Sequence, residues 1–141
     1  MTAKTHRIVV DTNLWVSMAL GSKTVTLQMQ QILTHANLSI FTSIEQLEEL
    51  TETLAKPKLQ KYLTTQRTQQ LFELIWQRAQ LIPIISQNKI CRDPKDDFII
   101  NLALDAQAHC IVTGDADLLV LNPIDALEIL TMTDFLQNVL V

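Results

Sequence analysis

Acidic side chains that follow predicted strands are the residues of this sequence best placed to do chemistry. Asp11 and Asp115 each come after a short apolar, β-branched run that is typical of a buried strand. Asp96 lies in the first turn of a predicted helix, and Asp117 follows Asp115 by two residues. Ligand sites of open α/β sheets form outside the carboxyl ends of the strands, so we expect these acids to face one edge of a sheet.

A cluster of carboxylates predicts a hard divalent cation. Two unit charges about 4 Å apart repel by ~4 kcal/mol at an effective dielectric constant of about 20, and without a cation some would take up protons. Oxygen ligands suit Mg²⁺ or Mn²⁺, which at a phosphate ester would activate water and stabilise the leaving oxygen. The histidines His6, His35 and His109 show no ligand spacing, so zinc is not expected.

Each acid taken alone also has a structural explanation. Asp is among the best helix N-caps, so Asp11 could cap the helix that follows it. Asp115 could be an ordinary turn residue after Gly114, and Asp93 is expected to be a cap and not a ligand. The coincidence of three acids, separated by full βα units and able to face one edge, favours a site.

The helix that begins at Ser43 offers a further acid, and its register leaves Glu48 and Glu49 open. Ser43 and Gln46 have the spacing of a capping box. Helical periodicity places Glu49 opposite the apolar side and Glu48 nearer the core flank. That apolar side is expected to consist of four residues, Ile44, Leu47, Leu50 and Leu54.

The register at the next acidic helix favours Asp96 over Asp97. Consecutive helical residues point about 100° apart, so both cannot project equally into one pocket. Asp96 precedes Ile99 and Ala103 of the apolar face by three and seven residues and shares their side. We therefore expect Asp97 to stay solvated or to contact a metal only through water.

Strands and helices alternate along the chain, which predicts an α/β fold with a mainly parallel central sheet. The predicted strands are Arg7–Val10, Leu38–Phe41, Leu81–Ile85 (an edge strand, because it contains Pro83), Cys110–Thr113 and Leu127–Leu130. The predicted helices are Leu14–Leu20, Val25–Ala36, one from Ser43 to Lys56-Pro57, Thr64–Gln80, Asp93–Gln107 and a last one capped by Thr133 or Asp134. No second domain is indicated, so residues 1–141 are expected to form a single domain.

Composition excludes several classes of protein. A hydrophobic fraction of 48% and a charged fraction of 18% indicate a globular chain. Asp11 and Asn13 interrupt the apolar stretch near the N-terminus, which argues against a signal peptide, and no segment is long enough for a membrane span. With Cys91 and Cys110 expected to be reduced thiols, the sequence predicts a soluble, cytoplasmic protein that does not bind membranes.

Several stretches resemble PIN-domain proteins, specifically the bacterial VapC-like toxins of toxin–antitoxin systems. The matching segments are IVVDTNLWVSMAL, ELTETLAKPKL, DPKDDFIINLALDAQAHCIVTGDADLL and ILTMTDFLQNVL. The TGDxDLL segment at its distance after DPxDD is specific, whereas DTN alone is a weak signal. The resemblance covers nearly the whole chain.

The resemblance implies a three-layer α/β/α PIN-like fold and an endoribonuclease that depends on Mg²⁺ or Mn²⁺. It implies a homodimer and an antitoxin protein whose peptide covers the acidic pocket. By position, Asp11, Asp96 and Asp115 match the metal-binding acids, and it is the resemblance that selects Glu49. The implied pocket is completed by Glu49 and Asp117, with Asn13 and Thr113 as polar supports for ligands or water.

The charge distribution is compatible with an RNA substrate but does not require one. The net charge of −4 is not that of a basic nucleic-acid-binding arm. All Lys and Arg lie at or before Lys95, while nine of the fifteen carboxylates lie from Asp93 onward. Four cations of the middle helices either meet RNA phosphates or form a solvated face: Lys56, Lys58, Lys61 and Arg67.

Two other functions compete with this interpretation of the sequence. One is an RNA-binding or scaffold module with an idle metal site, which the full set of acids argues against. The other is a phosphotransfer domain, which would require a DxD motif after the first strand and a Lys after a late strand. Here the motif is DTN, and no Lys follows Lys95.

Overall fold

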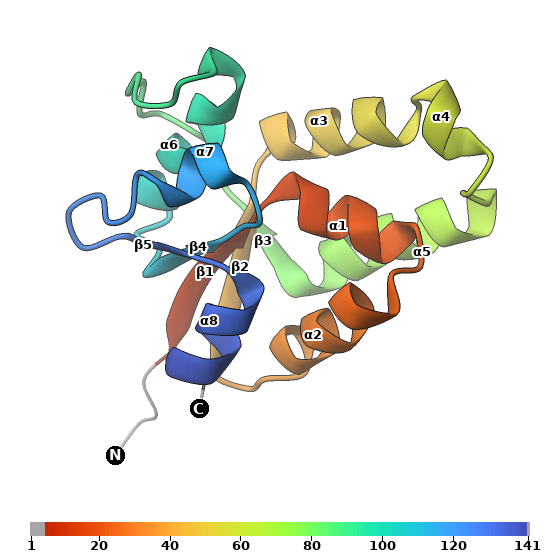
Figure 1. Cartoon of the computed structure of the whole chain (residues 1–141), viewed down its shortest axis with the longest axis horizontal. Coiled ribbons are helices and arrows are strands. Elements are labelled where there is room, and N and C mark those ends of the chain that lie inside the picture. The colour runs from red at the N-terminus through yellow and green to blue at the C-terminus, as the bar shows by residue number, and fades with distance from the viewer. Residues whose placement is uncertain (1–4, 141) are drawn as a thin grey trace.

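The computed structural model describes residues 5–140 and arranges five strands into one sheet (Figure 1). The strand order is β3-β2-β1-β4-β5, and each neighbouring pair is parallel. This confirms the predicted α/β fold with a parallel central sheet. The strands are β1 (His6–Val10), β2 (Leu38–Thr42), β3 (Ala79–Leu81), β4 (Cys110–Val112) and β5 (Glu128–Leu130).

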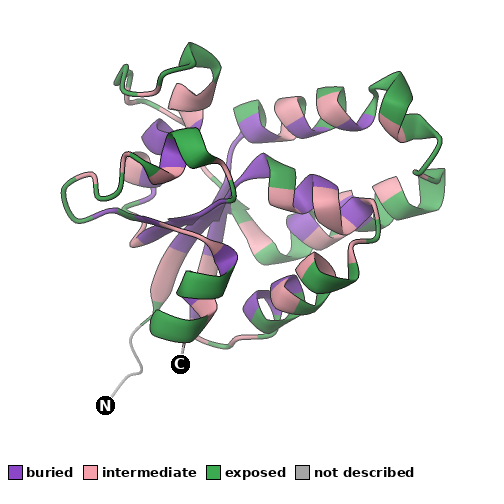
Figure 2. Cartoon of the chain, in the orientation of Figure 1, coloured by how far each residue is buried: buried purple, intermediate pink, exposed green. Residues whose placement is uncertain are grey.

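Both faces of the sheet are buried because successive strand residues point to opposite sides. In β1, Ile8 and Val10 enter one hydrophobic core and Val9 enters the other. In β4, Val112 joins the first core and Ile111 the second. Figure 2 shows the resulting buried sheet between exposed outer helix faces.

Helices cover both faces and give the expected three layers. The first core is covered by α1 (Thr12–Ala19), α2 (Lys23–Leu33), α3 (Ile44–Leu54), α4 (Pro57–Gln60), α5 (Thr65–Arg78) and α8 (Met132–Asn138). The second core is covered by α6 (Asp97–Asp105), which follows the 3₁₀ turn η1 (Pro94–Asp96), and by α7 (Ala116–Leu119). Among residues 5–140, no helix is long and apolar enough to cross a membrane.

The edge strand predicted over Leu81–Ile85 is present but lies earlier in the chain, at Ala79–Leu81. The edge strand β3 ends at Leu81, and residues 82–92, called the strap below, contain no regular strand or helix. Pro83 has no N–H to donate to a ladder. The N–H groups of Ile85 and Ser86 donate to Asp105 Oδ2 over 2.7 and 3.0 Å. Side chains therefore replace a strand as the partner of this backbone.

Three polar residues of α6, spaced four apart, hold the strap. Asp97 accepts the N–H groups of Ile90 and Cys91, and Asn101 accepts the N–H of Asn88 while donating to its carbonyl oxygen. Asp105 holds the start of the strap, as described above. Residues at this spacing lie on one helix face, so α6 presents a polar stripe that satisfies the strap's backbone.

Other differences concern helix ends and short helices. The short helices α4 and α7 were not predicted, and α2 ends at Leu33 rather than Ala36. Thr131, not Thr133 or Asp134, caps α8, because its hydroxyl accepts the Asp134 N–H over 3.1 Å. Ile44 is 53% exposed and so does not belong to the apolar face of α3.

Candidate acidic site at the sheet edge

Asp11 directly follows β1 at the carboxyl edge of the sheet, where its N–H donates to the Val112 carbonyl oxygen of β4. Its side chain is only 7% exposed, and Thr113 Oγ1 donates to Asp11 Oδ2 over 2.7 Å. Burial raises the pKa of Asp11, the Thr113 bond opposes that, and the charge of Asp115 raises it further. The backbone N–H groups of Thr12 and Asn13, at the start of α1, also lower the pKa of Asp11. Asp11 thus combines the N-cap position of α1 with a place in the acidic group.

Glu49 is the acid that α3 brings to this edge. It is half-buried, whereas Glu48 is exposed, and Thr12 Oγ1 donates to Glu49 Oε2 over 2.9 Å. Burial raises the pKa of Glu49, the bond from Thr12 lowers it, and the charge of Asp11 raises it again. Helical periodicity had placed Glu48 nearer the core, and the structure corrects that expectation.

A buried glutamine connects Glu49 to the sheet. Gln46 is 1% exposed, and its Oε1 accepts from Thr42 Oγ1 over 2.7 Å. Its Nε2 donates to the Val10 carbonyl oxygen at 2.7 Å and to Thr12 Oγ1 at 3.4 Å. Since Thr12 Oγ1 accepts from Gln46, its proton is free to point to Glu49.

Sequence reasoning missed this role of Gln46 and Thr12. Ser43 does accept the Gln46 N–H, over 3.2 Å, as the predicted capping box requires. The Gln46 side chain is instead committed to strands β1 and β2 and to Thr12. The available signal was a polar residue, Gln46, at a helix position whose neighbours on the same side, Leu50 and Leu54, are apolar.

Asp96 and Asp97 lie in different surroundings. Asp96 is half-buried, and its pKa is raised to about 6 by burial and then by the charges of four other carboxylates, Asp115, Asp93, Asp11 and Glu49. Asp97 Oδ1 accepts the N–H groups of Cys91 and Ile90 over 2.7 and 3.0 Å, and these bonds lower its pKa. Asp97 thus binds the backbone of the strap, while Asp96 interacts electrostatically with the other acids of the site.

The loop after β4 contributes Asp115. Thr113 Oγ1 accepts the Asp115 N–H over 3.0 Å while donating to Asp11, so one hydroxyl links both acids. Asp115 also caps α7, since its Oδ1 accepts the Asp117 N–H over 2.9 Å. A turn role and a site role therefore coexist in Asp115.

Asp117 and Asn13 lie at the periphery of this group. Asp117 is exposed, and its Oδ1 lies 4.0 Å from Arg92 Nη1. A surface pair of this kind contributes little to stability. Asn13 is also exposed, in the first turn of α1. Asp93 caps η1 through the Lys95 N–H at 3.0 Å, as predicted.

The donor set suits a hard cation that keeps several waters. Within residues 5–140, no three His, Cys, Asp or Glu side chains form a group that could hold a metal ion. That Asp11, Asp96 and Asp115 hold a metal ion, directly or through water, therefore stays a prediction. Mg²⁺ commonly binds through one or two carboxylates and otherwise retains water. Mutually repelling carboxylate oxygens, two of them held by threonine hydroxyls, fit that mode of binding.

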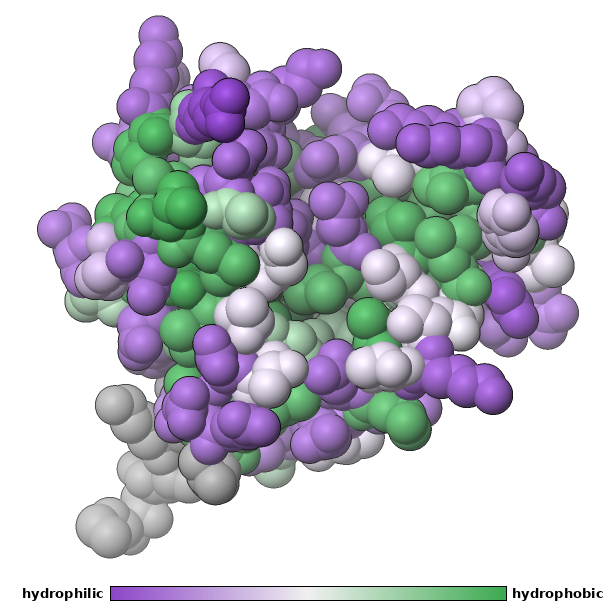
Figure 3. Space-filling view, viewed as in Figure 1, coloured by the Kyte–Doolittle hydropathy of each residue, from purple (hydrophilic) through white to green (hydrophobic). Residues whose placement is uncertain are grey.

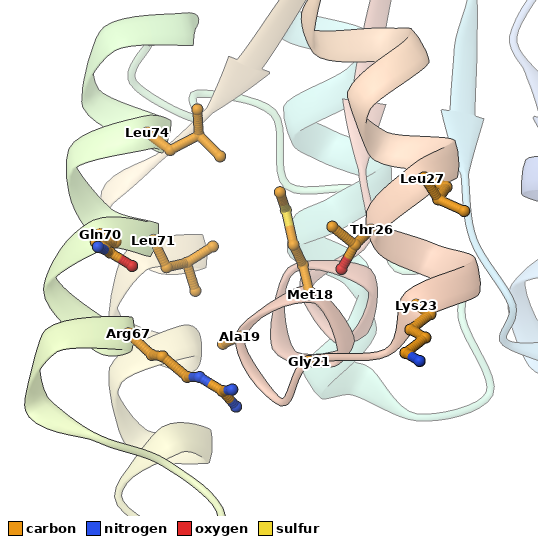
Figure 4. A pocket seen from close by; sticks show the side chains of 10 residues that line it. All are labelled: Met18, Ala19, Gly21, Lys23, Thr26, Leu27, Arg67, Gln70, Leu71 and Leu74. Atoms are coloured by element: carbon orange, nitrogen blue, oxygen red, sulfur yellow. The ribbon is translucent and has the colours of Figure 1, made fainter.

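A cavity lies elsewhere, between α1, α2 and α5 (Figure 4). Its volume is about 680 Å³, and Met18, Leu71 and Leu74 line it together with the cations Lys23 and Arg67. None of the candidate acids lines this cavity. Figure 3 shows hydrophobic side chains at the surface over α1 and α5. The cavity is therefore not the acidic site.

Comparison with known proteins agrees with this geometry. A PIN domain family model matches residues 7–117, a range that includes all five candidate acids. The chain is also 28% identical over 119 residues to an uncharacterized protein of Methanocaldococcus jannaschii, covering 82% of this chain and 75% of that protein. PIN domains are typically nucleases and generally use divalent metals. The extent of the family match shows that this chain belongs to the PIN domain family.

Proposed function

We propose that this protein is an endoribonuclease that hydrolyses RNA phosphodiester bonds with Mg²⁺ or Mn²⁺ at the acidic site. The observation that carries the proposal is the gathering of Asp11, Glu49 and Asp115, which hydrogen bonds with Thr12 and Thr113 hold at one edge of the sheet. Burial and the charges of these acids and of Asp93 raise the pKa of Asp96 to about 6. Gathering like charges is unfavourable without a cation. A fold that draws them from β1, α3, η1 and the loop after β4 is suited to binding one.

The residues divide into three roles in this proposal. Asp11, Asp96 and Asp115 hold the cation, directly or through water, and Thr113 fixes Asp11. When bound, the cation supplies an activated water and neutralises charge on the leaving oxygen. Glu49, oriented by Thr12, holds the attacking water by accepting a hydrogen bond from it. Asp117 and Asn13, both exposed, complete the rim of the pocket.

The alternative is an RNA-binding or scaffold PIN module with an idle metal site. One observation favours it, because no three ligating side chains within residues 5–140 form a metal-holding group. Binding without cleavage would distinguish this alternative from the nuclease.

A toxin role with a homodimer and an antitoxin partner is part of the proposal. It rests on the resemblance to VapC-like proteins and on exposed apolar surface that a protein partner could cover. Leu27 at the large cavity is 63% exposed, and Trp76 on α5 is 81% exposed, whereas Trp15 is buried in the core. Elution as a monomer at micromolar concentration would contradict the dimer.

The decisive experiment is an RNA cleavage assay with purified protein. We expect cleavage with Mn²⁺ or Mg²⁺, none with EDTA, and none with Asp115→Asn in either condition. Asp125→Asn is the matched control, since Asp125 has a φ of 51° that Asn also tolerates. Cleavage that persists in EDTA or in Asp115→Asn would assign the activity to a contaminant and refute the proposal.

A further inference from the structure

The region between α3 and α5 concentrates positive charge in an acidic protein. Residues 55–67, called the basic arm below, contain four cations, Lys56, Lys58, Lys61 and Arg67, while no Asp or Glu occurs between Glu52 and Glu73. The whole chain has a net charge of −4. The arm is thus a distinct basic surface, and Figure 1 shows α4 at the far end of α3 from the sheet.

The packing of the arm turns its cations outward. Leu59 and Leu63 are partly buried and pack against the first core, and the Gln60 amide donates to the Leu54 carbonyl oxygen at the end of α3. Lys58 and Lys61 are exposed as a result. These contacts attach the arm to the first core, with its cations on the solvent side.

An aromatic ring stands among these cations. Tyr62 is 60% exposed, and Lys61 Nζ lies 5.2 Å from the centre of its ring. Surfaces that bind single-stranded nucleic acid combine such aromatic platforms, on which bases stack, with cations that follow the backbone. An exposed Tyr beside Lys has the chemistry of both components.

The arm is continuous with the acidic site. Helix α3 carries Glu49 and ends at Leu54, and Lys56 follows in the turn between α3 and α4. The charge of Lys56 is close enough to lower the pKa of Glu49. A single RNA strand that lies along α3 could therefore contact both the basic arm and the acidic site.

We propose that the basic arm binds single-stranded RNA, with phosphates against Lys56, Lys58 and Lys61 and a base stacked on Tyr62. The part of this proposal that leads the strand to the acidic site rests on the proposed nuclease function. Bases inside an A-form duplex are stacked on one another and cannot splay onto a side chain. The arm therefore gives a preference for single strands over duplexes.

Fluorescence anisotropy in EDTA tests the aromatic platform without cleavage. Using a labelled unstructured RNA, we expect Tyr62→Leu to weaken binding by about 5- to 150-fold, and Tyr62→Phe to retain most of it. Ile85→Ala is the matched control, because Ile85 is also exposed (78%) but lies in the strap, outside the arm. Equal losses in Tyr62→Leu and Ile85→Ala, or equal wild-type affinity for a duplex, would overturn the proposal.

The salt dependence of the same binding tests the cations. Each phosphate contact to a single strand contributes a slope of about −0.7 in log K against log salt, so Lys56→Gln/Lys58→Gln/Lys61→Gln should reduce the slope by about 2. Arg78→Gln, at the end of α5 away from the arm, should leave it unchanged. Circular dichroism confirms that each variant folds.

The two proposals fail separately. Arm-dependent binding by a wild-type protein that cleaves nothing supports the arm and refutes the nuclease. If the wild type cleaves RNA and the arm variants bind RNA as tightly as the wild type does, only the proposal for the arm is refuted.

Discussion

Asp96→Asn and Asp97→Asn are expected to change stability in opposite directions without metal. Asp96 is held among other carboxylates, which raise its pKa after burial, so Asn removes an unfavourable charge. Asp97 accepts two strap N–H groups, and hydrogen bonds to an ionised acceptor are stronger than those to a neutral amide. Asp96→Asn should therefore raise the melting temperature at pH 8, and Asp97→Asn should lower it.

The size of the Asp96 effect follows from its pKa. A rise from 3.8 to about 6 corresponds to about 3 kcal/mol against the ionised folded state. Because Asp96 is partly exposed and solvent screens it, we reduce this to about 1 kcal/mol, which for a chain of this size is about 3 °C. In the unfolded chain Asp96 ionises near 3.8, so its penalty is absent below pH 4, grows between pH 4 and 6, and is complete above 6.

Calorimetry in EDTA at pH 4, 6 and 8 measures this crossover, and cleavage with Mn²⁺ is measured on the same preparations. Asp96→Asn should lose cleavage and Mn²⁺ binding, whereas Asp97→Asn should retain much of both. The reasoning is refuted if Asp97→Asn is the inactive variant, or if Asp96→Asn lowers the melting temperature at pH 8.

Three further outcomes are expected. Thr12→Val keeps the shape of the side chain but removes the hydroxyl that donates to Glu49; the cleavage rate should fall while Mn²⁺ affinity, measured by titration calorimetry, stays near that of wild type. Mn²⁺ at 100 times its Kd should stabilise the wild type by about 2.7 kcal/mol, read as a rise in melting temperature that Asp11→Asn lacks. Because protons compete for Asp96, whose pKa is about 6, Mn²⁺ affinity should be nearly constant between pH 7 and 8 and should fall steadily below pH 6; a flat profile down to pH 5 would contradict this.

Local signals in the sequence were sufficient for most of the fold. Short apolar runs marked β1, β2, β4 and β5, and the Asp-Pro start at Asp93 marked the turn before α6. These features depend on neighbours within a few residues, so periodicity and capping rules detect them. Strand order follows less directly, because pairing of β1 with both β2 and β4 joins residues about 30 and 100 positions apart.

Long-range hydrogen bonds were not predictable from periodicity. Leu81–Ile85 was predicted as an edge strand, but Asp105, twenty residues after Ile85, accepts the N–H groups of Ile85 and Ser86. Likewise Gln46 satisfies the Val10 carbonyl oxygen, which lies 36 positions away. Such pairings become visible only when two elements are placed side by side.

Helix α6 and the turn before it show why aspartates that lie close together in the sequence have different roles. Asp97 and Asp105 lie on the face that meets the strap, and there each accepts backbone N–H groups that would otherwise be unsatisfied. Asp96 precedes them in η1, and there its surroundings include the negative charges of Asp115 and Asp11, which raise its pKa. A buried or half-buried carboxylate that accepts hydrogen bonds stabilises a fold. One that faces other carboxylates destabilises the fold unless a cation is bound. The unfavourable position of Asp96 is therefore better evidence for a ligand than the mere number of acids in the sequence.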